Sequence, residues 1–286
     1  MSGIILETAQ DPRWMKSLAE SVGWNQTLED CRFLISGPLS IGIYARTGEG
    51  EVVGCGGCFT YGNGAYGHIH MIITREDHRG KGIARSIVTA LMEKAKCRSY
   101  RLYATKSGSY VYSKLGFQPK MGQVKYFAGR FTPPSAIPEE DRIAGEALLK
   151  KEMENVLSLD EKAFGFSRRE TLPYLLNNAP ETLLLPEKRE GELMGFSFCR
   201  RGPRACAVTL SAKDLETASS LLERALLLPG QEEKIQIVLF ENQEKFASLL
   251  EEKGFEKAVP MQVMDYGAPL PLPSPLVYGI AGGEFG

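Results

Sequence analysis

Apolar positions along the first sixty residues change from helical to strand spacing. Between residues 12 and 23 they recur every three or four positions, which predicts an amphipathic helix, and a shorter helix is predicted at 28–33. Residues 39–46 and 52–61 are instead rich in β-branched and aromatic side chains and flank a glycine-containing turn. We therefore expect a pair of helices followed by a meander of strands.

The meander leads into a third strand-like run at 68–73. This run passes through a charged turn into residues 83–95, whose apolar side chains make one helical stripe. A strand is expected at 99–105, and Gly116 is placed to end a short helix after it. A final strand at 125–131 would complete this first unit.

Beyond a proline-rich stretch the pattern returns. Three prolines between residues 132 and 140 disfavour a strand or a regular helix and predict a linker. Residues 277–286 either return as a last strand or form a flexible end. The expected helices are 152–164, 168–177, 213–227 and 242–253, and the expected strands are 182–186, 192–200, 204–211 and 235–240.

Composition narrows the class of protein. The chain has 286 residues, of which 43% are apolar, enough for two ordinary domains with real cores. Lys and Arg number 34 against 35 Asp and Glu, so no net basic field would attract nucleic acid or an anionic membrane. The sequence also lacks a bilayer-length apolar run and a secretory signal. We expect a cytoplasmic protein that binds neither nucleic acid nor membranes.

The six cysteines are irregularly spaced, which indicates reduced thiols rather than a disulfide framework. Cys55 and Cys58 lie three apart in a predicted strand, so their side chains point to opposite faces, and no second cysteine pair is near. Core packing is favoured over redox or metal chemistry. No metal site is predicted.

The turn Arg79-Gly80-Lys81-Gly82-Ile83-Ala84 carries the first chemical signal. Glycines leave the backbone N–H groups of a helix start open to a phosphate, and the helix dipole and the two cations favour an anion there. The turn has neither the Lys-Ser or Lys-Thr pair of a P-loop nor the third glycine of a dinucleotide fingerprint. It predicts a pyrophosphate site, with a ligand-free turn as the alternative.

Two motifs in order resemble the hallmarks of the GNAT superfamily of N-acetyltransferases. Arg79-x-x-Gly82-x-Ala84 is similar to motif A, and Tyr112-x-Lys114-x-Gly116-Phe117 is similar to the end of motif B. One predicted helix and one predicted strand separate them. The resemblance implies an α/β (α+β) domain with a mixed, mostly antiparallel sheet flanked by helices, and an acyltransferase activity.

The resemblance also implies acetyl-CoA as co-substrate. GNAT strands carry a bulge where this chain has Met71, Ile72 and Ile73, whose backbone would receive the pantetheine as an extra strand. The residues expected to hold the pyrophosphate are Arg79, Gly80, Lys81, Gly82, Ile83 and Ala84.

His68 and His70 are candidates for the base that takes a proton from the amine. They lie two apart on the central strand and so share one face, and an imidazole can accept a proton near neutral pH. The segment resembles a His-x-His segment of arylalkylamine N-acetyltransferase that serves as base. A pair of hydrogen-bonded strand histidines without a catalytic role is the alternative.

Tyr112 falls on the tyrosine of the family motif, which donates a proton to the leaving sulfur. A phenol has a higher reference pKa than a thiol, so it keeps its proton until thiolate forms. A packing role on the helix is the alternative. The acceptor pocket is expected near Trp24, Tyr126 and, from the second half, Phe164.

The second half resembles a degenerate GNAT copy. Residues 250–255 align with 112–117, but Leu250 replaces the tyrosine. Residues 211–216 lack paired glycines and carry carboxylates that would repel a pyrophosphate. We predict a catalytic domain at 1–131, a linker at 132–142 and a second domain at 143–286 that has lost CoA binding.

The sequence therefore predicts an acetyl-CoA-dependent N-acetyltransferase that acetylates a primary amine of a small molecule or peptide by direct attack. The alternative function is a non-catalytic acyl-CoA sensor that signals to a partner. Whether the chain forms a homodimer is left open.

Overall fold

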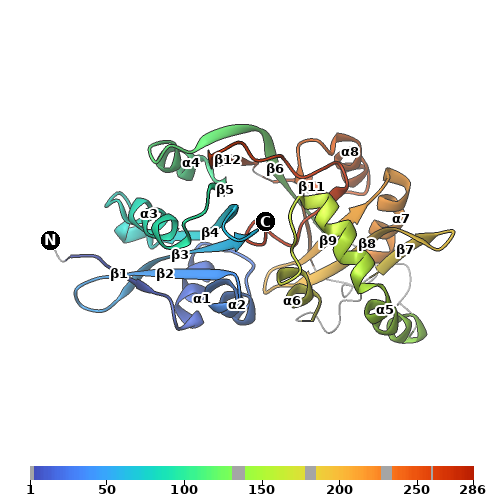
Figure 1. Cartoon of the computed structure of the whole chain (residues 1–286), viewed down its shortest axis with the longest axis horizontal. Helices are drawn as coiled ribbons and strands as arrows, with labels where there is room; N and C mark the ends of the chain where they lie inside the picture. Colours follow the sequence, from blue (N-terminus) through green and yellow to red (C-terminus); the bar gives the residue numbers. More distant parts are fainter. Residues whose placement is uncertain (1–2, 131–138, 178–184, 227–233, 259) are drawn as a thin grey trace. The chain divides into compact units, whose positions relative to one another are not determined.

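The computed structural model describes residues 3–130, 139–177, 185–226, 234–258 and 260–286, and these form two compact units (Figure 1). The first unit comprises Met1–Met121, Met261–Leu270 and Glu284–Gly286. The second comprises Gly122–Pro260 and Pro271–Gly283. Each unit is therefore assembled from separate stretches of the chain.

The first unit contains a mixed sheet in which β4 and β5 are parallel and every other neighbouring pair is antiparallel. The order across this sheet is β1-β2-β3-β4-β5-β12. The strands are β1 (Ile5–Thr8), β2 (Ser40–Arg46), β3 (Val52–Tyr61), β4 (Tyr66–Thr74), β5 (Ser99–Ala104) and β12 (Met261–Gly267). The helices are α1 (Pro12–Ser21), α2 (Leu28–Ser36), the short 3-10 helix η1 (Glu76–His78), α3 (Ile83–Ala95) and α4 (Lys106–Ser113).

Helices cover both faces of this sheet. A side chain at Gly54 or Gly56 of β3 would meet Ile83 or Ile87 of α3, so α3 packs closely on that face. On the opposite face Phe33 of α2 lies 5.6 Å, between ring centroids, from Phe59 of β3. The glycines of β3 thus allow α3 to approach the sheet.

The N-terminal helices begin where the sequence predicts. Asp11 caps α1, with Pro12 in the first turn, and Thr27 forms a capping box with Asp30 at the start of α2. These caps satisfy backbone N–H groups that have no partner within the helix.

One strand prediction is wrong. Residues 125–131 do not complete the first sheet, because β6 (Gln118–Arg130) pairs antiparallel with β10 (Lys234–Phe240) of the second unit from Val124 to Arg130. The strand that pairs with β5 in the first unit is β12, which runs antiparallel to it. Sequence pattern could not choose between these strands because either could pair with an open sheet edge.

The second unit contains its own mixed sheet, in the order β6-β10-β9-β8-β7, with β11 beside β6 and β13 beside β9. The further strands are β7 (Leu185–Arg189), β8 (Glu192–Arg201), β9 (Cys206–Ala212), β11 (Glu256–Lys257) and β13 (Val277–Gly279). The helices are α5 (Glu139–Phe164), α6 (Thr171–Asn177), α7 (Leu215–Ala225) and α8 (Glu244–Glu252).

The starts of α5 and β7 differ from the predicted boundaries. α5 begins at Glu139, so the last residues of the predicted linker 132–142 are helical, whereas 132–138 lie outside the described residues. Residues 182–184 of a predicted strand also lie outside them, and β7 begins at Leu185. The tail returns as a strand, β13, which was one of the two expected outcomes.

The two sheets repeat one plan. The order β2-β3-β4-β5-β12 corresponds to β7-β8-β9-β10-β6, and in each sheet the third and fourth of these strands are parallel. In both units the last helix ends at a glycine with positive φ, Gly116 (93°) and Gly254 (82°). A phenylalanine follows each and donates its N–H to Tyr112 or to Leu250. The internal duplication expected from the sequence is present in the fold.

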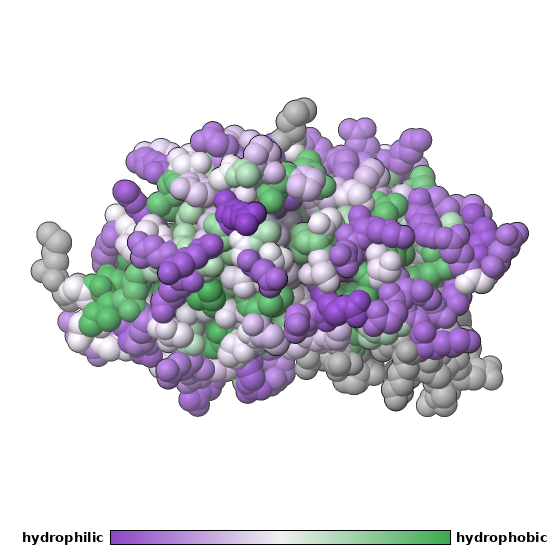
Figure 2. Space-filling view, viewed as in Figure 1, coloured by the Kyte–Doolittle hydropathy of each residue, from purple (hydrophilic) through white to green (hydrophobic). Residues whose placement is uncertain are grey.

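The described residues include no helix with the length and apolarity needed to cross a bilayer. On the face shown in Figure 2, apolar side chains form small clusters separated by charged and polar ones. All six cysteines are free, and Cys55 and Cys58 are completely buried, where burial raises the pKa of both thiols.

Candidate active site

The parallel strands β4 and β5 diverge in the middle of the first sheet. They pair from Tyr66 with Ser99 to His68 with Arg101, and β4 then continues to Thr74. Among the described residues no strand pairs with this part of β4 on the β5 side. The strands thus form a fork with one open backbone edge, which can receive an extended guest by β-strand addition.

A bulge lies in the open part of β4. Met71 has a φ of 53°, which is rare for a residue with a side chain, and the β3–β4 register shifts between Cys55 and Gly57. A bulge redirects the backbone groups of the strand that carries it. Met71, Ile72 and Ile73, the predicted pantetheine contacts, therefore lie on the open arm of the fork.

The glycine turn precedes α3. Gly80 and Gly82 have φ values of 77° and 80°, and nothing lies within 4 Å of a Cβ built at either position. Gly82 is the N-cap of α3 and has no side chain that could cap it. The first N–H groups of the helix are therefore not bonded by a capping side chain and can bind an anion.

The charges around this turn suit the same anion. Arg79 and Lys81 are exposed, and the first turn of α3 contains no acidic residue. The nearby carboxylate of Asp77 is bound to Arg75 at 2.7 Å, and the hydrogen bond from Arg75 holds the pKa of Asp77 well below its usual value. The uncapped N–H groups and the two exposed cations of this turn therefore suit an anion, and contact of the turn, Ile83 and Ala84 with a diphosphate stays a prediction.

His68 and His70 share the α2 face of β4, at the point where the fork opens. Both are buried, with exposed fractions of 0% and 4%, and their rings are 6.2 Å apart between centroids. The hydroxyl of Tyr66 lies 3.0 Å from Nδ1 of His68. Tyr66 thereby restrains the orientation of the His68 ring.

His70 has a different environment. Its two ring nitrogens find no hydrogen-bond partner among the described residues, and its ring packs against Phe59 with centroids 4.7 Å apart. Burial, with a smaller contribution from His68, lowers the pKa of His70 well below 6.5. At neutral pH His70 is therefore an uncharged imidazole able to accept a proton.

Gly57 of β3 makes room for this ring. It pairs with His70 across the strands, and a Cβ at position 57 would lie 2.2 Å from Cε1 of His70. Glycine inside a strand often marks such a close approach. The Gly-Gly pair between Cys55 and Cys58 was therefore a signal in the sequence for this part of the site, which the sequence analysis did not use.

Aromatic rings surround the two histidines. His68 makes an edge contact with Tyr103, and Tyr61 stacks on Tyr66 at 5.7 Å between centroids. The carboxylate of Asp265 is already paired with Arg101, at 2.7 Å and 2.9 Å, and with Lys120 at 3.5 Å. Aromatic rings thus pack against both histidines.

Tyr112 lies on α4 and is buried. It belongs to one apolar cluster with Ile69 of β4 and Ile83 of α3, and its ring packs 6.2 Å from that of Phe117. Burial raises the pKa of its phenol, so the hydroxyl is protonated at physiological pH. The fold therefore brings Tyr112 close to the strand that carries the histidines and to the helix that follows the glycine turn.

The three weaker candidates belong to two different units, and their contact with an acceptor stays a prediction. Trp24 is half-buried in the loop between α1 and α2. Tyr126 lies on the part of β6 that belongs to the second unit. The structure describes its backbone but not its side chain. Phe164, also in the second unit, is buried under the guanidinium of Arg168, which lies 3.5 Å from its ring centroid.

No three histidine, cysteine or acidic side chains of the described residues gather in a group that could hold a metal ion. The prediction that no metal takes part stays a prediction.

A strand that leads through a glycine turn into a helix is the arrangement that the sequence motifs implied, and in the structure this strand is one arm of the fork. The chain matches the acetyltransferase (GNAT) family over residues 8–117 and an acetyltransferase (GNAT) domain family over residues 156–279. These two ranges take in most of the chain. The chain belongs to the GNAT acetyltransferases, as a tandem member with two such domains.

Individual relatives agree with this assignment. The Bacillus subtilis protein named uncharacterized N-acetyltransferase YitH is 22% identical over 234 residues, which cover 81% of this chain and 80% of that protein. The crystal structure of a putative acetyltransferase from Pyrococcus horikoshii is similar with a TM-score of 0.76 and 19% identity, over 100% of this chain and 97% of that one.

A tandem GNAT protein from the clavulanic acid biosynthesis pathway is similar with a TM-score of 0.60 and 14% identity, over 95% of this chain and 100% of that one. At these identities the two structural likenesses concern the fold. They agree with the two-unit plan described above.

Proposed function

We propose that the first unit transfers an acetyl group from acetyl-CoA to a primary amine of a small molecule or peptide, by direct attack of the amine. The observation that carries this proposal is the coincidence, at one fork of the sheet, of an open backbone edge, an uncapped glycine turn and a buried histidine pair. Bound acetyl-CoA would supply the acetyl thioester.

The binding roles follow from backbone geometry. The N–H groups at the start of α3, with Arg79 and Lys81, would hold the diphosphate, and the open arm of β4 would hold the pantetheine as an added strand. N–H groups near the bulge at Met71 would donate to the oxygen that becomes negative when the amine adds to the carbonyl.

The proton roles follow from the surroundings of each side chain. His70, neutral and without a partner among the described residues, would accept a proton from the ammonium, directly or through water, so that nitrogen can form the new bond. His68, oriented by Tyr66, is the second candidate base. Tyr112 would give its proton to the sulfur as the carbon–sulfur bond breaks, and the second proton that nitrogen loses as the amide forms would balance it and restore the phenol.

For the acceptor we propose an amine on an apolar or aromatic body. The specific observation is that aromatic rings pack against the histidines, while the carboxylate of Asp265 is engaged by two cations. Rings of this kind bind an apolar body well, whereas a polyamine would require carboxylates for its additional charges.

A thiol-release assay with acetyl-CoA and a panel of amines tests both statements. The panel should contain arylalkylamines, aliphatic polyamines and a lysine peptide, with the arylalkylamines expected to give the highest kcat/KM. Turnover of polyamines alone would contradict the acceptor proposal. Binding of acetyl-CoA without turnover of any amine would favour the non-catalytic sensor instead.

His68→Ala and His70→Ala, each assayed across pH, test the base. The acid limb of the pH–rate profile is expected to change in at least one of the two variants. An acid limb that stays in place in both would remove these histidines from the mechanism.

A further inference from the structure

The second unit contains the same fork as the first. β9 and β10 run parallel and pair from Cys206 with Ile235 to Val208 with Ile237. As in the first unit, the parallel pairing ends there, while β9 continues to Ala212. By position along the strand, Leu210 corresponds to His70, since each lies two residues beyond the last parallel pair.

A segment of the chain's own tail occupies this second fork. β13 pairs antiparallel with β9, Val277 with Ser211 and Gly279 with Leu210. The N–H of Ala212 donates to the carbonyl of Leu276 at 2.9 Å. The open edge of the strand is therefore satisfied from within the chain.

The same segment also reaches the other arm of the fork. The N–H of Ile280 donates to the carbonyl of Val238 in β10 at 3.1 Å. Gly279 lies where the arms separate, since a Cβ there would be 3.0 Å from the carbonyl oxygen of Val208 and 3.3 Å from a methyl group of Ile237. A side chain at position 279 would not fit without movement of the strands.

Side chains hold the segment in place. Gln243, which is buried, donates from Nε2 to the carbonyls of Pro275 at 2.6 Å and Val277 at 2.7 Å. Tyr278 packs edge-on against Phe246 of α8 with centroids 5.1 Å apart, and Ile280 is 1% exposed. The segment is thus packed as part of the core of the second unit.

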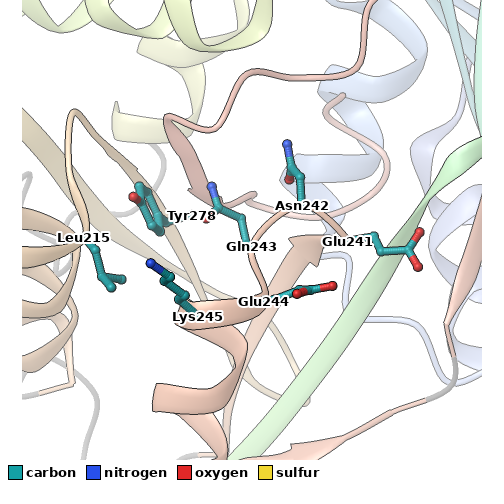
Figure 3. A pocket seen from close by; sticks show the side chains of 7 residues that line it. All are labelled: Leu215, Glu241, Asn242, Gln243, Glu244, Lys245 and Tyr278. Carbon is teal, nitrogen blue, oxygen red and sulfur yellow. The ribbon is translucent and has the colours of Figure 1, made fainter.

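The mouth of the second fork does not suit a phosphate. A cavity of about 300 Å³ lies between the start of α7, the start of α8 and β13, and it is lined by Glu241 and Glu244 as well as Lys245 (Figure 3). Asp214 caps α7 by accepting from the N–H of Thr217 at 2.8 Å. The position that corresponds to the uncapped Gly82 is therefore filled by a carboxylate.

We propose that residues 274–280 are a built-in ligand of the second fork, taking the place that the pantetheine takes in the first, so that one chain binds one acyl-CoA. The statement about the first fork rests on the function proposed above. The statement about the second fork rests on the contacts of the tail alone.

Isothermal titration of the full chain with acetyl-CoA, followed by hydrogen exchange with and without saturating cofactor, tests the proposal. One equivalent is expected to bind. Those amides of residues 69–74 that face the open edge should gain at least about tenfold protection, because they acquire strand partners. The amides of Ala212 and Ile280 should be protected already and change by less than about twofold.

The possible failures are distinguishable. Two equivalents of acetyl-CoA, or a change in protection at Ala212 and Ile280 on its addition, would overturn the built-in ligand. Absence of any binding would overturn the proposed function of the first unit. In that case the exchange of Ala212 and Ile280 without cofactor would still test whether residues 274–280 occupy the second fork. Fast exchange at these two amides would contradict it.

Gln243→Ala removes two hydrogen bonds to the segment and should speed exchange at Ala212 and Ile280 by at least about tenfold. The matched control is Gln262→Ala in the first unit, whose Nε2 likewise donates to two carbonyls, those of Lys120 and Val263. The control should leave exchange at these two amides unchanged. Equal exchange in both variants would show that Gln243 does not hold the segment.

Discussion

The two forks have the same strand arrangement, but one is open and the other is occupied by the tail. In the first unit the parallel strands diverge and leave a backbone edge open, and in the second the tail pairs with the same edge. The connection to the following helix differs too, since residues 75–82 contain η1 and the glycines of the turn before α3, whereas only residues 213 and 214 precede α7. The same sheet plan thus occurs with an open edge and with an occupied one.

Helix caps show the same contrast. α3 begins at a glycine without a capping side chain, and α7 begins at Asp214, which bonds its own helix. A carboxylate cap stabilises a helix, so α7 gains stability where α3 keeps the capacity to bind an anion. Substitutions that make one unit more like the other, or that weaken one of them, test this comparison. The largest expected change is a loss of stability on substitution in β12.

Asp265→Ala should destabilise the first unit by about 3–5 kcal/mol, because it removes the carboxylate that receives two hydrogen bonds from the buried Arg101. Chemical denaturation would measure the free energy of unfolding, and peptide-resolved hydrogen exchange would locate the change. Exchange should accelerate in the segments of the first unit.

Asp160→Ala is the matched control, since Asp160 forms a similarly buried pair with Arg168 in the second unit. It should accelerate exchange in the second unit instead. A loss below about 1 kcal/mol for Asp265→Ala would contradict the importance of β12 for the first sheet.

Gly82→Asp puts at the start of α3 the residue type that stands at the start of α7. The carboxylate would compete for the helix N–H groups and repel a diphosphate, so the Kd of acetyl-CoA should rise at least about 100-fold, and less at high salt. Isothermal titration at two ionic strengths would measure it.

Gly82→Asn is the uncharged control, because asparagine tolerates the positive φ of this position and has nearly the same shape as aspartate. Its loss of affinity should stay below about tenfold. Equal losses of affinity in the two variants would mean that the size of the side chain, not its charge, weakens acetyl-CoA binding.

Tyr112→Phe should lower kcat by at least about tenfold and leave the Kd of acetyl-CoA nearly unchanged, because only the proton donor is removed. Leu250 occupies the corresponding position of the second unit. Tyr110→Phe is the control, since this tyrosine is 66% exposed and lies beside Lys114. Unchanged turnover in Tyr112→Phe would assign it a packing role.

His70→Leu installs the residue that the second fork carries, and its effect should depend on pH. The folded protein holds the pKa of His70 well below 6.5, so between that value and about 6.5 the unfolded chain binds more protons. Stability should therefore rise with pH through this window and fall as the solution is acidified below about pH 6.5.

In His70→Leu this part of the pH dependence should disappear, a change of up to about 1.4 kcal/mol per pH unit. Denaturant titrations between pH 5 and pH 7 would measure it. The same slope in both proteins would show that His70 is not held neutral by the fold.

The comparison also shows what sequence reasoning could reach. The helix starts at Pro12 and Leu28, the glycine turn and the motif glycine Gly116 depend on local chemistry, and the structure places them as expected. The closing strand was assigned to the wrong residues, because β12 lies far from β5 in sequence and strand pairing over such distances leaves no local pattern.

The site was predictable to a similar degree. Alternation along β4 places His68 and His70 on one face, which periodicity alone implies. Their differing environments depend on Tyr66, Phe59 and Gly57, which come from contacts across strands, although the glycine pair in β3 was a usable sign of close approach. The catalytic roles themselves stay predictions.

The position of β12 in the chain has a consequence for biosynthesis. The first unit lacks its closing strand until residues 261–267 have left the ribosome, although its other strands end at Ala104. At about 5–20 residues per second this wait lasts roughly 10–30 s. During it the edge of β5 stays without its partner, so a nascent chain of this enzyme should depend on chaperones until residues 261–267 emerge.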